Sequence, residues 1–155
     1  MAVNFKLVSE FQTINRRPFE LADPAVLDPT SVSPVPLVEG EFLQLDTAYK
    51  MARGAGDALV PSYAFFAEQG RYETQAIQKG PFLYMGEYEA DTLIMDATGV
   101  TLGMMLIVAD VTIATLARRG LARWPAVPVG GEYAIGHVTR LPANNGGYLR
   151  FIRNR

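Results

Sequence analysis

Cysteine is absent from this chain, and histidine occurs once, at His137. The absence of cysteine excludes disulfides, thiolate nucleophiles and cysteine-based metal sites, so stability has to come from packing or assembly. A single histidine restricts histidine-based catalysis to one position. We therefore expect a protein that is made and kept in a reducing compartment.

Charged residues and long apolar runs are also scarce. Charged residues make up 19% of the chain, with 14 basic and 16 acidic side chains and a net charge of −2. This balance gives no general attraction to nucleic acid or to an anionic membrane. The longest apolar stretch, LGMMLIVA, is far shorter than the roughly 20 residues that span a bilayer. The opening MAVNFKLVSEF lacks the basic-then-apolar layout of a signal peptide, so we expect a soluble protein.

What the chain does contain is enough apolar material for one packed domain. Hydrophobic residues make up 49% of the 155 residues. The first 36 residues differ from the rest, because they hold five of the ten prolines: Pro18, Pro24, Pro29, Pro34 and Pro36. Each proline removes a backbone donor and favours an extended predecessor. We predict an extended N-terminal arm over residues 1–36 and a folded domain over residues 37–155.

The predicted arm is too apolar for a solvated linker. Side-chain burial alone does not offset the entropy of ordering so many residues, so the arm needs a surface and backbone hydrogen bonds. Two alternatives stay open: the arm binds a partner, or it wraps its own domain. The anchors that we expect on a partner are Phe5, Phe11, Phe19 and Leu21.

From residue 37 onward, short strands alternate with turn residues, which is typical of a barrel or sandwich. We count eight to ten strands and no long helix. The stretch DVTIATLARRG, residues 110–120, has helix-capping signals, but its β-branched residues favour a strand. Near the C-terminus, residues 133–141 and 148–152 predict a hairpin, with Asn145 and Gly146 in the turn. The expected fold class is all-β, a single β-barrel or jelly-roll-like sandwich with an N-terminal arm.

Candidate catalytic and metal sites are few. His137 shares its predicted strand face with apolar and hydroxyl side chains, and no orienting carboxylate or nucleophile lies nearby in sequence. Glu87, Glu89 and Asp91 follow a strand period, but this row lacks a calcium-wrapping loop. No phosphate loop, nucleophile elbow or zinc-protease motif occurs. We predict no enzymatic activity and no cofactor.

Charge is unevenly distributed along the second half of the chain. Residues 81–117 contain five acidic and no basic residues, whereas residues 118–155 contain seven arginines and one acidic residue, Glu132. The two groups either pair between copies or cancel within the fold. On the first alternative, Arg118, Arg119 and Arg153 join the anchors as partner-binding residues.

Three segments resemble the small β-rich proteins that decorate or cement the heads of tailed bacteriophages. They are EGEFLQLDTAYKMARG, SYAFFAEQGRYETQAIQKGPFLYMGEYEADTLIMD and GEYAIGHVTRLPANNGGYLRFIRN, and together they cover most of residues 38–154. The matching pattern is Gly-Glu before a strand, an aromatic block ending in an acid-bounded strand, and Gly-x-Val before a glycine-containing turn. These motifs are features of a fold and carry no catalytic group.

The resemblance implies a virion protein on the capsid exterior, made in the host cytoplasm. Such a protein bridges major capsid subunits and stabilises the shell, often as a trimer or dimer, without a cofactor, nucleic acid or membrane. Two alternatives stay open. One is another virion component, namely a tail-tube, connector or fibre-attachment protein. The other is a small ligand-binding or enzymatic barrel that uses His137 or the acidic row.

Overall fold

The computed structural model describes residues 4–11, 15–22, 37–53, 62–65, 79–127 and 133–154. In these ranges the chain forms eleven strands and a short 3-10 helix, η2 (Pro142–Asn144). The strands are β1 (Phe5–Glu10), β2 (Asn15–Glu20), β3 (Phe42–Leu45), β4 (Met51–Ala52), β5 (Tyr63–Phe65), β6 (Lys79–Met85), β7 (Tyr88–Thr92), β8 (Met105–Ile113), β9 (Leu116–Arg123), β10 (Gly136–Arg140) and β11 (Leu149–Arg153). The predicted all-β class is confirmed.

The larger sheet has six antiparallel strands in the order β1-β7-β11-β10-β8-β9. It curls until the residues that follow β7 meet β9, where Leu121 donates its N–H to the Ile94 carbonyl over 3.0 Å. Asp96 in turn donates its N–H to the Leu121 carbonyl over 2.8 Å. Gly120 allows this approach, since a Cβ there would lie 2.4 Å from the Ile94 carbonyl oxygen. The larger sheet is therefore closed like a barrel, with β1 added outside β7.

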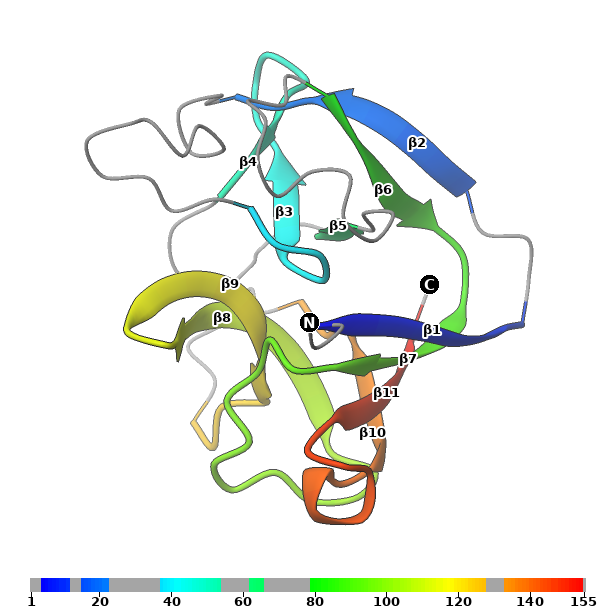
Figure 1. Cartoon of the computed structure of the whole chain (residues 1–155), viewed down its shortest axis with the longest axis vertical. Coiled ribbons are helices and arrows are strands. Elements are labelled where there is room, and N and C mark those ends of the chain that lie inside the picture. The colour runs from blue at the N-terminus through cyan, green and yellow to red at the C-terminus, as the bar shows by residue number, and fades with distance from the viewer. Residues whose placement is uncertain are drawn as a thin grey trace.

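The smaller sheet has five strands in the order β2-β6-β5-β3-β4. An isolated parallel bridge joins Leu21, just after β2, to Met51 in β4. Ala22 adds a backbone hydrogen bond to the Met51 carbonyl, with N and O 2.8 Å apart. In Figure 1 this sheet occupies the upper half of the molecule and the larger sheet the lower half.

A bent two-stranded ribbon joins the two sheets. One arm of the ribbon consists of β1 and β2, the strands on either side of residues 12–14, and the other runs from β6 through Gly86, at φ 116°, into β7. β1 pairs with β7 in the larger sheet, and β2 pairs with β6 in the smaller one. At the corner, Phe11 donates its N–H to the Glu87 carbonyl over 3.1 Å. The same two chain segments therefore belong to both sheets (Figure 1).

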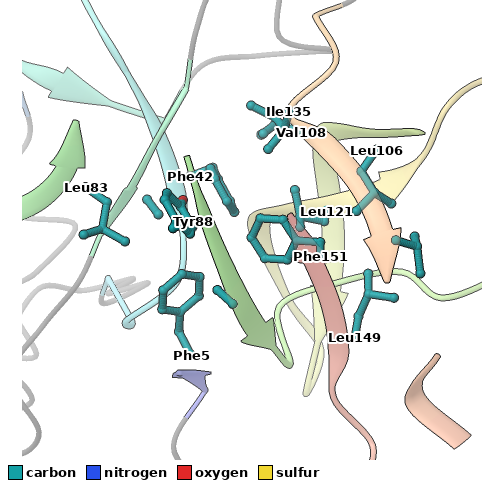
Figure 2. Close-up of a cluster of buried hydrophobic side chains, with 13 residues drawn as sticks. Phe5, Phe42, Leu83, Tyr88, Leu106, Val108, Leu121, Ile135, Leu149 and Phe151 are labelled. Atoms are coloured by element: carbon teal, nitrogen blue, oxygen red, sulfur yellow. The ribbon is translucent and has the colours of Figure 1, made fainter. Parts of the chain in front are cut away.

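The main core lies inside the larger sheet and reaches toward the smaller one. Aromatic rings from four different strands meet in it, and Figure 2 shows them side by side: Phe5, Phe42, Tyr88 and Phe151. The Phe5 centroid lies 6.4 Å from the Tyr88 centroid in an edge-to-face arrangement. Such pairs stabilise a core by about 0.5–1.5 kcal/mol beyond the area that they bury. A second, smaller hydrophobic cluster includes Met51 and Phe82 of the smaller sheet.

The structure corrects the predicted arm over residues 1–36. Residues 5–10 and 15–20 are strands of the two sheets, so this part of the segment wraps its own domain. Pro18 concealed β2 in the sequence, because proline removes a ladder donor. It is tolerated at an end strand of the smaller sheet, opposite Pro81 of β6. Residues 23–36 lie outside the described ranges.

The strands from residue 37 onward match the expectation more closely. Nine of the described strands fall in this region, within the predicted eight to ten. Residues 110–120, which carry both helix and strand signals, form the end of β8, a turn and the start of β9. The strand preference of their β-branched residues therefore outweighs the helix-capping signals. The C-terminal hairpin is also confirmed, with one correction in its turn. Positive φ occurs at Gly146 and Gly147, whereas Asn145 has φ −141° and closes η2.

Candidate functional site

Most of the residues that we expected on a partner are buried in the fold itself. Phe5 is 2% exposed and Leu21 is also buried, while Phe19 is half-buried with its centroid 6.1 Å from that of Phe82. Arg118, Arg119 and Arg153 are buried as well. In the folded chain, Phe5, Leu21 and the three arginines therefore have little surface left for contact with a partner. Phe11 differs from the others, with 52% of its surface exposed.

Arg118 belongs to a buried ion cluster around Glu41. The Glu41 carboxylate is fully buried and accepts a hydrogen bond from Arg118 Nη1 at 2.6 Å. Arg53 donates from Nε to Oε2 and from Nη2 to Oε1, each over 2.8 Å. The Val38 N–H adds a fourth donor at 3.1 Å. Glu41 precedes β3 and Arg118 lies in β9, so the cluster ties the smaller sheet to the larger one.

Arg119 lies beside an open cleft of about 520 Å³ between β8 and the residues that follow β7. The cleft is lined by Met95, Asp96, Ala97, Asp110, Val111 and Thr112. Arg119 Nη1 donates to the Asp110 carboxylate over 3.0 Å. Thr98 donates its N–H to Asp96 over 2.9 Å, and hydrogen bonds from Thr98 hold the pKa of that carboxyl below its ordinary value. Two carboxylates that already have partners supply too few oxygens for a calcium site.

Arg153 reaches from β11 into the region between the two sheets. Its Nη1 donates to the Ser62 carbonyl, and its guanidinium carbon lies 5.7 Å from the centroid of the Tyr63 ring. Tyr88 is the cross-strand partner of Arg153. Burial raises the pKa of the Tyr88 hydroxyl, and the neighbouring charge of Arg153 offsets part of that rise. Arg153 is thus a second internal tie between the sheets.

Two members of the predicted acidic row, Asp91 and Glu89, also have partners within the fold. Asp91 is buried and bidentate with Arg150, at 2.7 Å from Nε to Oδ1 and 3.0 Å from Nη2 to Oδ2. Asn145 donates to the same carboxylate over 2.8 Å. Burial alone would raise the pKa of Asp91, but these hydrogen bonds and the charges of Arg150 and Lys6 hold it below its ordinary value.

Glu89 of the same row also has a partner within the fold, since it accepts a hydrogen bond from the Thr139 hydroxyl over 3.0 Å. For the ion pairs of Asp91 with Arg150 and of Asp110 with Arg119, opposite charges therefore cancel between neighbouring strands of one copy. This is the second of the two alternatives that the sequence left open.

His137 lies on the outer face of β10, partly buried. Its cross-strand neighbours are Met105 of β8 and Ile152 of β11. Neither side chain can orient an imidazole or act as a nucleophile. Among the described residues, no three histidine or acidic side chains come close enough to hold a metal ion.

Several large apolar side chains are exposed, and sequence reasoning missed most of them. They are Val8, Phe11, Tyr49, Leu102, Met105, Leu116 and Val127. Tyr49 is 81% exposed and has φ 59°. Its turn is stabilised by the Asp46 carboxylate, which accepts hydrogen bonds from the Ala48 and Lys50 N–H groups at 2.8 and 2.9 Å. The Asp46-Thr47 pair is a turn signal, but it does not report which way the next aromatic points.

No helix in the described part of the chain is long and apolar enough to cross a membrane. Comparison of the chain with protein-family models, with curated proteins and with solved structures gave no match.

Proposed function

We propose that this chain is a structural protein of a bacteriophage virion, which binds the outer capsid surface and bridges neighbouring major capsid subunits. One observation carries the proposal beyond the sequence resemblance. In the described part of the chain, three acidic side chains described above form ion pairs with arginines of the same fold, while exposed large side chains include Phe11, Tyr49 and Met105. Such a surface suits contacts with other proteins better than chemistry on a small molecule.

The contact surface differs from the one expected from the sequence. A shell repeats the same contact many times, so modest contacts from exposed apolar residues can give a stable layer through avidity. Phe11 stays among the proposed partner contacts, and Tyr49 joins it because a rigid turn presents its ring to solvent. Little side-chain and backbone entropy would be lost when such a ring binds.

Another virion component is the alternative: a tail-tube, connector or fibre-attachment protein. Assembly behaviour separates it from a cement protein. A tube protein forms rings or polymers by itself, whereas a cement protein stays a small oligomer until shells are supplied. Electron microscopy of the purified chain at high concentration distinguishes these two behaviours.

Gold labelling of intact particles tests the proposed location. Particles from the native source would be incubated with antibodies raised against the purified chain and then with gold-conjugated secondary antibody. We expect gold over the heads of intact particles and none after the antibody is pre-adsorbed with the purified chain. Gold confined to tails would support the alternative, and particles without specific gold would overturn the proposal.

A further inference from the structure

Arg153 is a buried cation with no counter-ion in the described part of the chain. It is 4% exposed, and its described contacts include the Ser62 carbonyl and the ring of Tyr63, neither of which carries a net charge. Arg118, which is also buried, differs because it pairs with the Glu41 carboxylate over 2.6 Å. A charge is costly to bury without a partner of opposite sign, so the surroundings of Arg153 lack a negative charge.

Two buried hydroxyl groups belong to residues next to Arg153. Neither Ser62 Oγ nor Tyr88 Oη has a hydrogen-bond partner of good geometry. Ser62 is the residue whose carbonyl accepts from Arg153, and Tyr88 is the cross-strand partner of Arg153. Burial raises the pKa of the Tyr88 hydroxyl, and the charge of Arg153 offsets only part of that rise. This hydroxyl is therefore a neutral donor at physiological pH and cannot be the counter-ion.

A hydrogen-bond acceptor would complete this group of side chains. Buried hydroxyls almost always have a partner, which is protein, ordered water or an ion. The Arg153 guanidinium has five N–H donors, and the Ser62 carbonyl accepts from one of its nitrogens. Water could accept from the remaining donors, but it would leave the buried charge uncompensated. A monovalent anion accepts charge-assisted hydrogen bonds and also cancels the charge.

We propose that Arg153, Ser62 and Tyr88 form a binding site for a small monovalent inorganic anion, of which chloride is the probe. Tyr88 and Arg153 belong to the larger sheet, whereas Ser62 directly precedes β5 of the smaller one. A bound anion would therefore hold the two sheets together through donors from both. Because only the folded chain brings these donors together, the stability of the protein would rise with the anion concentration.

The dependence of stability on chloride tests the site in the full-length chain. Urea unfolding would be followed by circular dichroism in mixtures of sodium chloride and sodium gluconate at constant ionic strength. Gluconate serves as the replacement because it is too large for a site closed by buried side chains. The ratio of folded to unfolded protein should rise about tenfold when chloride reaches about ten times its Kd.

Variants of the three residues show where chloride acts. Tyr88→Phe and Ser62→Ala each remove one donor and should raise the Kd for chloride by about tenfold. Arg153→Gln should abolish the chloride dependence, and the two hydroxyl variants still test the site if Arg153→Gln fails to fold. Tyr148→Phe is the matched control, because it removes a tyrosine hydroxyl from a half-buried ring that lies under Lys6, and it should keep the full dependence.

Two results would overturn the proposal. Stability of the unmodified chain that does not change with chloride at constant ionic strength would show that no such anion binds. A chloride dependence that persists unchanged in both Tyr88→Phe and Ser62→Ala would show a general salt effect in place of a site. The outcome is independent of the virion role, which the labelling of particles tests separately.

Discussion

At the scale of single residues, the buried charges show how this chain holds its sheets together without disulfides. Glu41 has four donors around one carboxylate, from Arg53, Arg118 and the Val38 backbone. Ions are costly to bury, and their mutual attraction offsets that cost only when the geometry is good and the remaining donors and acceptors have partners. The cluster is therefore sensitive to the loss of any one member.

Replacing Glu41 by glutamine should lower the free energy of unfolding by about 3–5 kcal/mol, because buried Arg118 loses its counter-ion. The matched control is Glu20→Gln. Glu20 pairs with Lys50 at 3.6 Å with both side chains about half exposed, and loss of such a pair should cost about 0–1 kcal/mol. Urea unfolding followed by circular dichroism measures both. Equal losses in the two variants would contradict the role given to Glu41.

Asp91 should make stability depend on pH in acid. Hydrogen bonds from Arg150 and Asn145 help hold its pKa in the folded chain below the ordinary value of 3.8. The folded chain therefore binds this proton less readily than the unfolded chain. The resulting stabilisation is complete above the pKa of the unfolded chain and is lost as the pH falls through the lower pKa of the folded chain.

We accordingly expect Asp91→Asn to be less stable than the unmodified protein at neutral pH, with a difference in the free energy of unfolding that narrows as the pH falls below the ordinary carboxyl pKa of 3.8. Urea unfolding at a series of pH values measures this difference. A difference that stays constant with pH would show that the Asp91 carboxylate contributes packing only.

Residue types and sign patterns were visible in the sequence, but the pairings were not. Asp91 and Arg150 are 59 positions apart, and Arg118 is 77 positions from Glu41. Strand order decides which of many acids meets which arginine, and no local period encodes that order. For this reason the sequence showed an acidic half and a basic half while leaving open whether they pair within one copy.

At the scale of elements, the β8–β9 hairpin carries an unusual turn. Ala114 and Thr115 have φ 48° and 70°, a conformation in which asparagine and glycine are favoured. The left-handed region costs an ordinary residue roughly 1–2 kcal/mol, and β-branched threonine fits it poorly. Eight cross-strand pairs between β8 and β9 hold the hairpin in this conformation.

Thr115→Gly should therefore raise the free energy of unfolding by about 1 kcal/mol, after allowing for the greater freedom of glycine in the unfolded chain. Thr112→Gly is the matched control, because Thr112 is exposed in β8 opposite Ala117 and an extended strand gains nothing from glycine. This control should lose about 1 kcal/mol. Thermal and urea unfolding compare the two variants, and destabilisation by Thr115→Gly would contradict a strained turn.

Elements of the second half were predicted well because their turn chemistry and alternation agree. β10 and β11 follow a period of two, and the glycines between them provide the positive φ that the turn needs. The first 22 residues were harder to interpret, since Pro18 argues against a strand and four more prolines follow between residues 24 and 36. β2 tolerates Pro18 because β2 lies at the end of the smaller sheet, where the described strands hydrogen-bond to it on one side only. Which strand lies at the end of a sheet depends on the tertiary arrangement and cannot be seen in the local sequence.

At the scale of the whole molecule, the N-terminal segment is part of the fold, and two phenylalanines in it provide a direct comparison. Phe5 lies in the aromatic core, whereas half of the Phe11 surface is exposed. Phe5→Ala should cost about 3–5 kcal/mol of stability, since it opens a cavity beside Tyr88 and Phe151. Phe11→Ala should change stability by about 0.5 kcal/mol or less, as is usual for surface sites.

Urea unfolding of the two variants shows whether the N-terminal segment is integrated into the fold or is a detachable arm. A detachable arm would give small and similar losses in the free energy of unfolding for both variants. Truncation of residues 1–30, harmless for a detachable arm, should instead unfold the protein, because it removes both β1 and β2. Partner contacts in this segment are consequently best tested by substitution of Phe11 and not by deletion.

The virion role is tested most directly by density-gradient sedimentation of a lysate from the native source, with the chain quantified in every fraction. We expect the protein to band with DNA-filled particles in a fixed, many-copy ratio to the major capsid protein. If the chain stays in the soluble fractions while particles band without it, the capsid assignment is contradicted, and the exposed surface of this fold serves another partner.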